Sequence, residues 1–531
     1  MAADQDYQPL HAGFLNSVDR VPALEALRVQ GQSYSYKALY ESAAGLSATL
    51  QRYDHEPDLL TAVLGRRSLT TYAGLLAALM RGTGYLALNP KHPGSRVRVV
   101  LECSRASSVL VDESGEGLLE ELVGENPRVW VLPHRADVSE YQARWPAHTF
   151  VGASDLAPAD QWVPVQTACD DIAYVLFTSG TSGQPKGVVV EHQNVTHFVD
   201  TLFKQYKLTH EDNVSQFPET TFDGSVADIW PAWKAGATLC VPSDMDVLKT
   251  HEFIVREELT VFTFVPSLSA TLLRLGLLKP NAFERLRIWA FGAESVPLEL
   301  AQACAQAAPN AVIDNQYGPT EATVAVTIYR WKPNQSSEFK DGTLPMGLPL
   351  TGTQYRLLDE DFRDVPEGTP GELWVGGSQV ARGYWDDPSR TEAVFRTLPG
   401  SDVRFYRTGD RVMYEPELDS LRFLGRVDEQ LKVRGHRVEP TEVERVLREL
   451  SGAVRVVAVG WPITAPGAAD GLVVFIESKE LDVDALLTGA AAKLPEYMRP
   501  RRIIFEDRFP LTANGKIDLP ALTASLSEID T

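Results

Sequence analysis

Residues 174–188 read YVLFTSGTSGQPKGV, an apolar strand-like run that leads into a loop of glycines and hydroxyls. Gly180, Gly183 and Gly187 permit tight turns and a close approach of backbone N–H groups to an anion. Lys186 adds a positive charge, so the loop suits a polyphosphate. It is not a Walker A loop, because the lysine precedes a glycine where that pattern needs serine or threonine after the lysine. A loop rich in glycine, serine and threonine is by itself more often an ordinary surface loop than a phosphate-binding site. The rest of the chain decides between these two interpretations.

Outward from this loop, short apolar runs alternate with longer amphipathic ones. Runs such as TAVLG (61–65), TVFTFV (260–265) and RIWAF (287–291) are typical of buried strands. Between them, TYAGLLAALM (71–80) and LSATLLRLG (268–276) are typical of helices. The alternation predicts an α/β fold with mainly parallel sheets.

Composition limits the possible partners and locations. The chain has 531 residues, too many for one ordinary core, and a net charge of −21, which disfavours nucleic acid and anionic membranes. The four cysteines form no C-x-x-C pair, so neither a zinc site nor a disulfide framework is expected. The polar N-terminus is unlike a signal peptide, and the longest apolar run is too short to span a bilayer. We expect a cytoplasmic enzyme.

A change of composition indicates a second domain. Residues 421–440, LRFLGRVDEQLKVRGHRVEP, are rich in charge and end at Pro440. Thr441 and Glu444 then form the T-x-x-E pattern of a capping box, which predicts that a helix begins at the threonine. Strand-like runs follow, so the last hundred or so residues are expected to form a small α+β domain. A charged hairpin inside one domain explains the same stretch equally well.

Five stretches downstream of the loop decide its interpretation. Together with TSGTSGQPKG (178–187), these stretches resemble the motifs of the adenylate-forming superfamily and occur in the same order as those motifs. The superfamily comprises acyl-CoA synthetases, luciferases and the adenylation domains of non-ribosomal peptide synthetases. Weaker similarity begins near residue 10, so the resemblance covers nearly the whole chain. The stretches are NQYGPTEATV (315–324), GELWVGGSQVARGYWDDP (371–388), YRTGD (406–410), GRVDEQLKVRGHRVEPTEVE (425–444) and FPLTANGKIDLPAL (509–522).

The resemblance implies that ATP and Mg²⁺ are the cofactors. Tyr317 and Gly318 would contact the nucleotide, with the tyrosine ring stacked on adenine, and Asp410 would accept hydrogen bonds from the ribose hydroxyls. Glu321 would hold Mg²⁺, a hard cation that suits carboxylate and phosphate oxygens. Thr320 would contact phosphate and Arg426 would help to hold the nucleotide. The phosphate loop would contribute Thr178, Ser179, Gly180, Thr181, Ser182, Gly183 and Lys186.

The central catalytic residue implied by the resemblance is Lys516. A carboxylate that attacks the α-phosphate brings two anions together, and a bridging ammonium stabilises the transition state most. Asp428 matches the hinge about which the small domain of the family rotates between two half-reactions. We therefore expect a large N-terminal domain, residues 1–427, of doubly wound mainly parallel sheets with a small barrel-like part. A mobile α+β domain, residues 428–531, would follow.

The substrate is predicted to be an amino acid. TFDGSVADIW (221–230) resembles the F-D-x-S-V element of amino-acid-activating members, in which an aspartate at the position of Asp223 pairs with the substrate ammonium. A buried ammonium needs such a counter-charge. The remaining pocket positions implied by the family carry no charge, and they are Gly224, Ala227, Thr263, Trp289, Phe291, Gln316, Val324 and Ala325.

These positions leave two sizes of substrate open. Trp289 and Phe291 are bulky enough to leave room only for glycine or alanine, whereas Gly224 and Ala227 are small and could admit a ring. FDGSVADIW and FGAESVP (291–297) also resemble the D-alanine-activating ligases of teichoic acid modification. A small neutral amino acid is the favoured prediction.

The acceptor is expected to be the phosphopantetheine thiol of a carrier protein. The chain contains no carrier segment with an L-G-G-x-S setting, so the carrier is a separate protein or the chain is an excised domain. Need for a small activator protein stays open. An acyl-CoA or aryl-acid ligase of the same superfamily is the first alternative, and a non-catalytic amino-acid-binding module is the second. The presence of Lys516, Glu321 and Asp410 disfavours the second.

Overall fold

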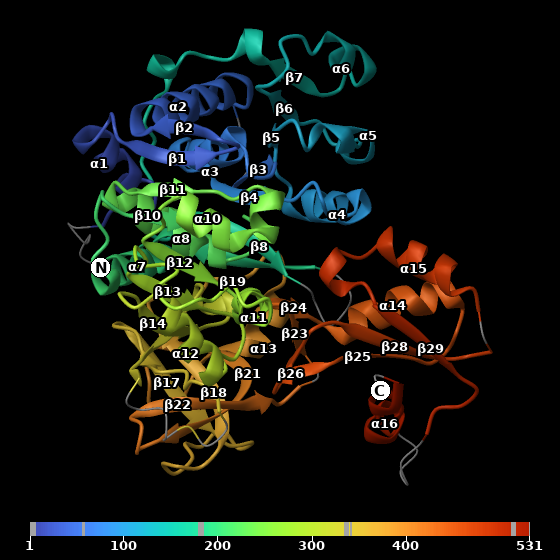
Figure 1. The fold of residues 1–531 in the computed structure, drawn as a ribbon. Coiled ribbons are helices and arrows are strands. Elements are labelled where there is room, and N and C mark those ends of the chain that lie inside the picture. The colour runs from blue at the N-terminus through green and yellow to red at the C-terminus, as the bar shows by residue number, and fades with distance from the viewer. Residues whose placement is uncertain are drawn as a thin grey trace. The chain divides into compact units, whose positions relative to one another are not determined.

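The computed structural model describes residues 7–55, 59–178, 185–333, 339, 342–428, 430–479, 481–510 and 517–529 (Figure 1). Described residues up to Thr178 and from Lys186 to Asp428 form one compact unit, and those from Gln430 onward belong to a second. Asp428, the predicted hinge, is thus the last residue of the first unit. Its role as a hinge stays a prediction.

A largely parallel sheet in the first unit contains the strand that enters the phosphate loop. Parallel pairing joins β8 to β4, β3, β5, β6 and β7 in turn, and β9 and β19 extend the sheet in antiparallel pairing. In sheet order, the strands are β19 (Gly383–Tyr384), β9 (Lys186–Glu191), β8 (Ile172–Thr178), β4 (Gly84–Leu88), β3 (Leu60–Leu64), β5 (Ser108–Val111), β6 (Val129–Leu132) and β7 (Thr149–Gly152).

A second largely parallel sheet contains β14, the strand that leads into the NQYGPTE motif. Its inner strands pair in parallel and its edges are antiparallel. The order is β16 (Leu348–Pro349), β15 (Thr327–Trp331), β14 (Val312–Tyr317), β13 (Ile288–Phe291), β12 (Val261–Phe264), β10 (Asn213–Ser215), β11 (Thr238–Cys240), β1 (Glu25–Val29) and β2 (Gln32–Ser35).

The third sheet of the first unit is antiparallel. The long strand β21 pairs with β18, β20 and β22, and this pairing sets Asp410 opposite Arg426. The strands are β17 (Thr353–Leu358), β18 (Gly371–Gly377), β20 (Phe395–Thr397), β21 (Arg404–Glu415) and β22 (Ser420–Arg426).

Helices pack on the two parallel sheets. The side chains of Ser35 and Ser68 accept hydrogen bonds from backbone N–H groups and so cap α2 and α3. Buried residues of α3 and α8, including Trp230 and Trp233, share one core cluster with residues of both parallel sheets. The helices are α1 (Ala12–Arg20), α2 (Tyr36–Tyr53), α3 (Leu69–Met80), α4 (Gly94–Ser104), α5 (Leu119–Leu122), α6 (Ser139–Arg144), α7 (His192–Tyr206), α8 (Gly224–Ala235), α9 (Asp244–Leu248), α10 (Thr250–Arg256), α11 (Pro266–Arg274), α12 (Leu298–Ala307) and α13 (Pro388–Val394).

The second unit is a small α+β body. One sheet has the order β25 (Val456–Gly460), β28 (Leu472–Glu477) and β29 (Arg502–Glu506), and another has the order β24 (His436–Val438), β23 (Leu431–Val433), β27 (Ala468–Ala469) and β26 (Ile463–Ala465). Helices α14 (Pro440–Ser451), α15 (Val483–Ala491) and α16 (Leu519–Ile529) accompany them. The predicted α/β class with a smaller C-terminal α+β part is confirmed.

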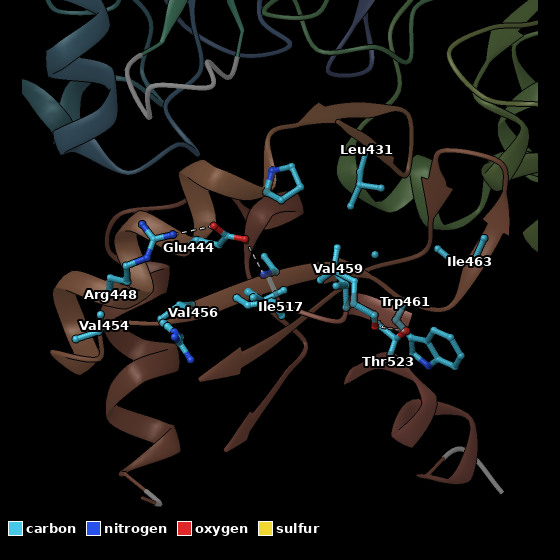
Figure 2. A pocket seen from close by; sticks show the side chains of 16 residues that line it. Leu431, Glu444, Arg448, Val454, Val456, Val459, Trp461, Ile463, Ile517 and Thr523 are labelled. Atoms are coloured by element: carbon cyan, nitrogen blue, oxygen red, sulfur yellow. Dashed lines mark hydrogen bonds and ion pairs between the residues drawn. The ribbon is translucent and has the colours of Figure 1, made fainter. Parts of the chain in front are cut away.

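The predicted capping box at the start of α14 is wrong. The helix begins at Pro440, a residue suited to the first turn because its missing N–H would be unpaired there. The carboxylate of Glu444 instead accepts hydrogen bonds from the Ala458 N–H, at 3.1 Å, and from Arg448, at 2.8 Å. Figure 2 shows both bonds beside a groove of about 790 Å³ that follows β25. None of the residues lining this groove belongs to the predicted site.

Candidate active site

A buried lysine, a tyrosine and a glutamate meet where β9 begins. Lys186 is the first residue of β9, Tyr384 lies in β19, and Glu321 lies in the short 3-10 helix η4 (Thr320–Ala322). The Lys186 Nζ lies 3.2 Å from Glu321 Oε1 and 3.4 Å from the Tyr384 hydroxyl. That hydroxyl donates a hydrogen bond of 2.8 Å to Glu321 Oε1. Glu321 is fully buried, so its charge needs these partners.

The lysine ammonium also lies over the Tyr384 ring, 5.0 Å from its centroid. Such a contact adds a favourable cation–π interaction. The phenol therefore holds both ionic groups, through its ring and through its hydroxyl. The sequence alone does not single out Tyr384, because GYWDDP is informative only through its resemblance to the family segment. A tyrosine at the end of a glycine-rich segment gives no periodic signal.

Part of the predicted phosphate loop lies outside the described residues. These are Ser179, Gly180, Thr181, Ser182 and Gly183, and the predicted catalytic Lys516 also lies outside them. Thr178 is described and ends β8. Its hydroxyl is buried and has no hydrogen-bond partner among the described residues, as expected of a group that serves a ligand.

The predicted nucleotide residues form a second cluster. The Tyr317 hydroxyl donates to one oxygen of Asp410, and Arg426 donates to the other. Arg426 also makes a bidentate pair with Asp428, at 2.6 and 2.8 Å. Burial, followed by the neighbouring Asp410 carboxylate, raises the pKa of Tyr317 well above its usual value. The phenol therefore stays neutral, with an apolar face suited to stacking.

Glycines permit the close packing of this cluster. A Cβ on Gly409, whose φ is +73°, would lie 2.7 Å from the Arg426 guanidinium. A Cβ on Gly318 would lie 2.5 Å from the Val324 carbonyl oxygen. Glycine is thus favoured at 409 by its positive φ and required at 318 by the close approach of backbone.

Asp223 lies at the N-terminus of α8. It is 7% exposed and is the N-cap residue, but its side chain makes no capping hydrogen bond. Its charge acts on Tyr174, whose pKa is raised well above its usual value by burial first and by Tyr85 and Asp223 next. A Cβ on Gly224 would lie 2.9 Å from the Phe222 ring, and Ala227 follows half-buried in α8.

Four other pocket positions lie on β12, β13 and β14 and divide between two faces. Trp289 and Phe291 are wholly buried in one aromatic cluster, and the Trp289 ring packs against Phe262 at 5.4 Å. Alternation along the paired strands directs Thr263 and Gln316 to the opposite face, where the Gln316 amide donates to Tyr206 at 2.7 Å. Restriction of the substrate by the Trp289 and Phe291 rings stays a prediction.

Val324 and Ala325 follow η4 in a turn with unusual backbone angles. Val324 is half-buried and Ala325 is buried. Gln379, which the motif comparison did not single out, lies against this turn with 1% exposure. A glutamine within a glycine-rich segment is the one sequence signal that could have identified it, because a polar side chain that becomes buried usually has a defined partner.

The donor set suits Mg²⁺ better than a metal held by protein alone. Among the described residues, no group of three or more His, Cys, Asp and Glu side chains could hold a metal. One carboxylate, Glu321, stands beside Lys186 at the start of β9. Mg²⁺ typically takes one or two carboxylates and completes its shell with substrate phosphates and water, so the residues fit this cation.

Comparison with known proteins identifies relatives over the whole chain. The model for AMP-binding enzymes matches residues 14–385, and that for the AMP-binding enzyme C-terminal domain matches residues 442–516. The chain is 32% identical over 517 residues to tyrocidine synthase 3 of Brevibacillus parabrevis, covering 97% of this chain and 8% of the synthase. It is 30% identical over 526 residues to tyrocidine synthase 1 of the same bacterium, covering 97% and 44%. The chain spans less than half the length of these relatives.

Solved structures are similar in both sequence and fold. The adenylation domain AlmE of Vibrio cholerae, in complex with glycyl-adenosine-5'-phosphate, superposes with a TM-score of 0.88 at 27% identity over 99% of each chain. PA1221, a nonribosomal peptide synthetase protein with adenylation and PCP domains, gives 0.80 at 26% identity, covering 98% of this chain and 84% of that one. Each helix among the described residues is too short or too polar to cross a membrane.

Proposed function

The chain belongs to the AMP-binding enzyme family as an adenylation-domain enzyme, and from this premise we propose that it activates a small neutral amino acid with ATP. The amino-acid carboxylate would attack the α-phosphorus, and the bond to pyrophosphate would break. The products would be an aminoacyl-adenylate and pyrophosphate. The thiol of a phosphopantetheinylated carrier would then attack the acyl carbon and release AMP.

The buried carboxylate of Asp223 is the observation that carries the choice of an amino acid. It stands at the start of α8 and does not cap that helix with its side chain. A buried carboxylate at this position suits a substrate ammonium, because the two opposite charges offset each other's desolvation. An acid without an amine would offer Asp223 no positive charge.

The two polar clusters support the assignment of ATP. Tyr317 would stack on adenine, and Asp410, held by Arg426, would accept hydrogen bonds from the ribose hydroxyls. Lys186 would contact phosphate beside the loop, and Lys516 would bridge the attacking and phosphoryl oxygens. Mg²⁺ bound at Glu321 would neutralise phosphate charge and orient the leaving pyrophosphate.

Two observations support a small substrate. Apart from Asp223, none of the predicted pocket positions has a charged side chain, so a charged substrate side chain would be desolvated without a partner. AlmE, which superposes over 99% of the chain, was captured with a glycyl adenylate. For the acceptor, the PCP domain of PA1221 supports a carrier, either separate or part of a longer chain.

The test is ATP–pyrophosphate exchange, scanned over glycine, both alanine enantiomers, β-alanine, the other proteinogenic amino acids, and aryl and fatty acids. We expect one strong response among the small amino acids. An aromatic responder would retain the reaction and overturn the proposed size limit. Exchange only with acids that lack an amine would overturn the role of Asp223 and indicate an acyl or aryl ligase. If exchange is absent, co-expression with a small activator protein separates a missing activator from a non-catalytic module.

A further inference from the structure

The turn that follows Glu321 is strained at two consecutive residues. Thr323 has a φ of +58° and Val324 a φ of +70°. The Ala325 N–H donates to the Thr323 carbonyl at 3.0 Å, which makes a γ-turn with positive φ at Val324. This type of γ-turn is rare, and positive φ is especially unfavourable for β-branched residues. Something outside the turn must therefore hold it.

Gln379 makes several contacts that hold this turn. Its Nε2 donates to the Ala325 carbonyl at 2.7 Å and to the Thr323 carbonyl at 3.3 Å. Its own backbone carbonyl accepts a bond of 2.6 Å from the Thr323 hydroxyl. The side chain and the backbone of one residue thus bind both ends of the γ-turn.

Neighbouring groups fix the position of Gln379 in turn. The Asn194 amide, on α7, donates to the carbonyl groups of Ser378 at 2.8 Å and Val380 at 3.1 Å, one on each side of Gln379. The Ala381 N–H donates to the Glu321 carbonyl at 3.0 Å. The segment is therefore anchored before and after Gln379, and the glutamine side chain has one well-defined direction.

We infer that Gln379 is a positioning residue that sets the shape of the amino-acid pocket by holding Val324 and Ala325 in this turn. The inference rests on the proposed function, because the family positions of these two residues assign them to the pocket. Without the amide, the turn relaxes toward negative φ and the Val324 side chain and the Ala325 backbone move. The nucleotide cluster of Tyr317, Asp410 and Arg426 has no bond to the Gln379 side chain in the described structure and stays in place.

The first experiment replaces Gln379 with methionine, which preserves length and apolar volume but donates no hydrogen bond. With the amino acid found by the exchange scan, we expect its KM to rise by about tenfold, the equivalent of one to two buried hydrogen bonds, while the KM for ATP changes by less than about twofold. Discrimination against larger neutral amino acids should fall by a similar factor.

Gln142→Met is the matched control. The Gln142 amide likewise bridges backbone groups, donating to the His148 carbonyl at 2.8 Å and accepting from the Phe150 N–H at 3.0 Å. It lies in α6 and contacts no residue assigned to the site. This variant should lower the thermal midpoint while both KM values stay unchanged. An equal rise of both KM values in Gln379→Met, or an unchanged KM for the amino acid, would overturn the inference.

A rescue experiment separates positioning from simple loss of stability. Val324→Gly allows the positive φ without strain, so the turn no longer needs the amide. In the Val324→Gly background, Gln379→Met should raise the amino-acid KM by less than about threefold and should shift the thermal midpoint less than it does in the original chain. Equal effects in the two backgrounds would contradict the inference.

Two further measurements test the inference if the first variant does not fold or if the unaltered chain shows no activity. If Gln379→Met does not fold, Thr323→Val removes only the 2.6 Å bond to the Gln379 carbonyl, and the same split between the two KM values is expected at smaller size. If the unaltered chain shows no exchange with any amino acid, even when it is co-expressed with a small activator protein, the proposed function has failed. The thermal cycle of Gln379→Met and Val324→Gly still tests whether the amide holds the turn.

Discussion

Removing the Tyr384 hydroxyl tests whether the cluster at the start of β9 binds the metal–nucleotide complex. Tyr384→Phe deletes the donor that lies 2.8 Å from Glu321 and 3.4 Å from Lys186, and it leaves the ring beneath the ammonium. A hydrogen bond to a charged group contributes about 1.5–3 kcal/mol. Since Glu321 keeps its 3.2 Å contact with Lys186, we take the low end, about 1.5–2 kcal/mol, which is a factor of about ten to thirty.

The assay is amino-acid-dependent ATP–pyrophosphate exchange over a Mg²⁺ titration. We expect kcat/KM for Mg–ATP to fall by this factor and the half-saturating Mg²⁺ concentration to rise, because Glu321 is no longer held by the hydroxyl. Mg²⁺-dependent binding of a fluorescent ATP analogue provides a readout without turnover. A smaller change in the KM for the amino acid would show that the loss is confined to the nucleotide side.

Tyr36→Phe is the control, because the buried Tyr36 hydroxyl donates to the Ala237 carbonyl at 2.7 Å in the core. It should lower the thermal midpoint and leave the Mg²⁺ requirement alone. The reasoning is refuted if Tyr384→Phe keeps the original Mg²⁺ requirement, or if both variants change it equally.

Further predictions concern the substrate, the catalytic lysine, the pocket and pH. Asp223→Ala should raise the amino-acid KM strongly with little change in the KM for ATP, and an unchanged amino-acid KM would remove the proposed ammonium contact. Lys516→Ala should lower adenylate formation by about 10²–10³ while equilibrium ATP binding persists. Phe291→Gly should admit larger side chains in the exchange scan if that ring limits the pocket. Burial lowers the pKa of His11 to about 4. Burial, followed by the neighbouring His11, lowers the pKa of His192 to about 3. Between pH 6.5, the usual histidine pKa, and about pH 4, the unfolded chain binds protons that the folded chain does not. The free energy of unfolding, measured by urea titration, should therefore fall as the pH is lowered, by up to about 2.7 kcal/mol per pH unit for the two histidines together.

The elements and the motif residues were largely predictable from the sequence. The apolar run before the phosphate loop forms β8, and the α/β alternation gives the parallel sheets. The motif residues Tyr317, Asp410 and Arg426 come together because β21 and β22 pair in a register that sets Asp410 opposite Arg426. The resemblance supplied this grouping, and hydrophobic periodicity alone does not contain it.

Other features depend on contacts that no local pattern encodes. The hydroxyl of Tyr384 meets Glu321 across 63 positions of sequence, and the Gln379 amide meets Ala325 across 54. The start of α14 was misplaced because Thr441 and Glu444 satisfy a local capping pattern, whereas tertiary contacts with Arg448 and β25 take the glutamate. Side-chain partners of this kind follow from packing and become visible only with coordinates.

The glycine-rich segment 376–384 connects the two halves of the proposed reaction. Its Gln379 binds the Val324–Ala325 turn, the proposed wall of the amino-acid pocket, whereas its Ala381 N–H and Tyr384 hydroxyl bind Glu321, the proposed magnesium ligand. A Cβ on Gly377 would lie 2.2 Å from the Gly352 carbonyl oxygen, so the backbone of the segment packs directly on the backbone at Gly352. We therefore expect Gln379→Met and Tyr384→Phe, which act on different substrates, to combine additively in kcat/KM if this backbone is rigid. A coupling above about 0.5 kcal/mol in the double variant would mean that the segment moves as one element.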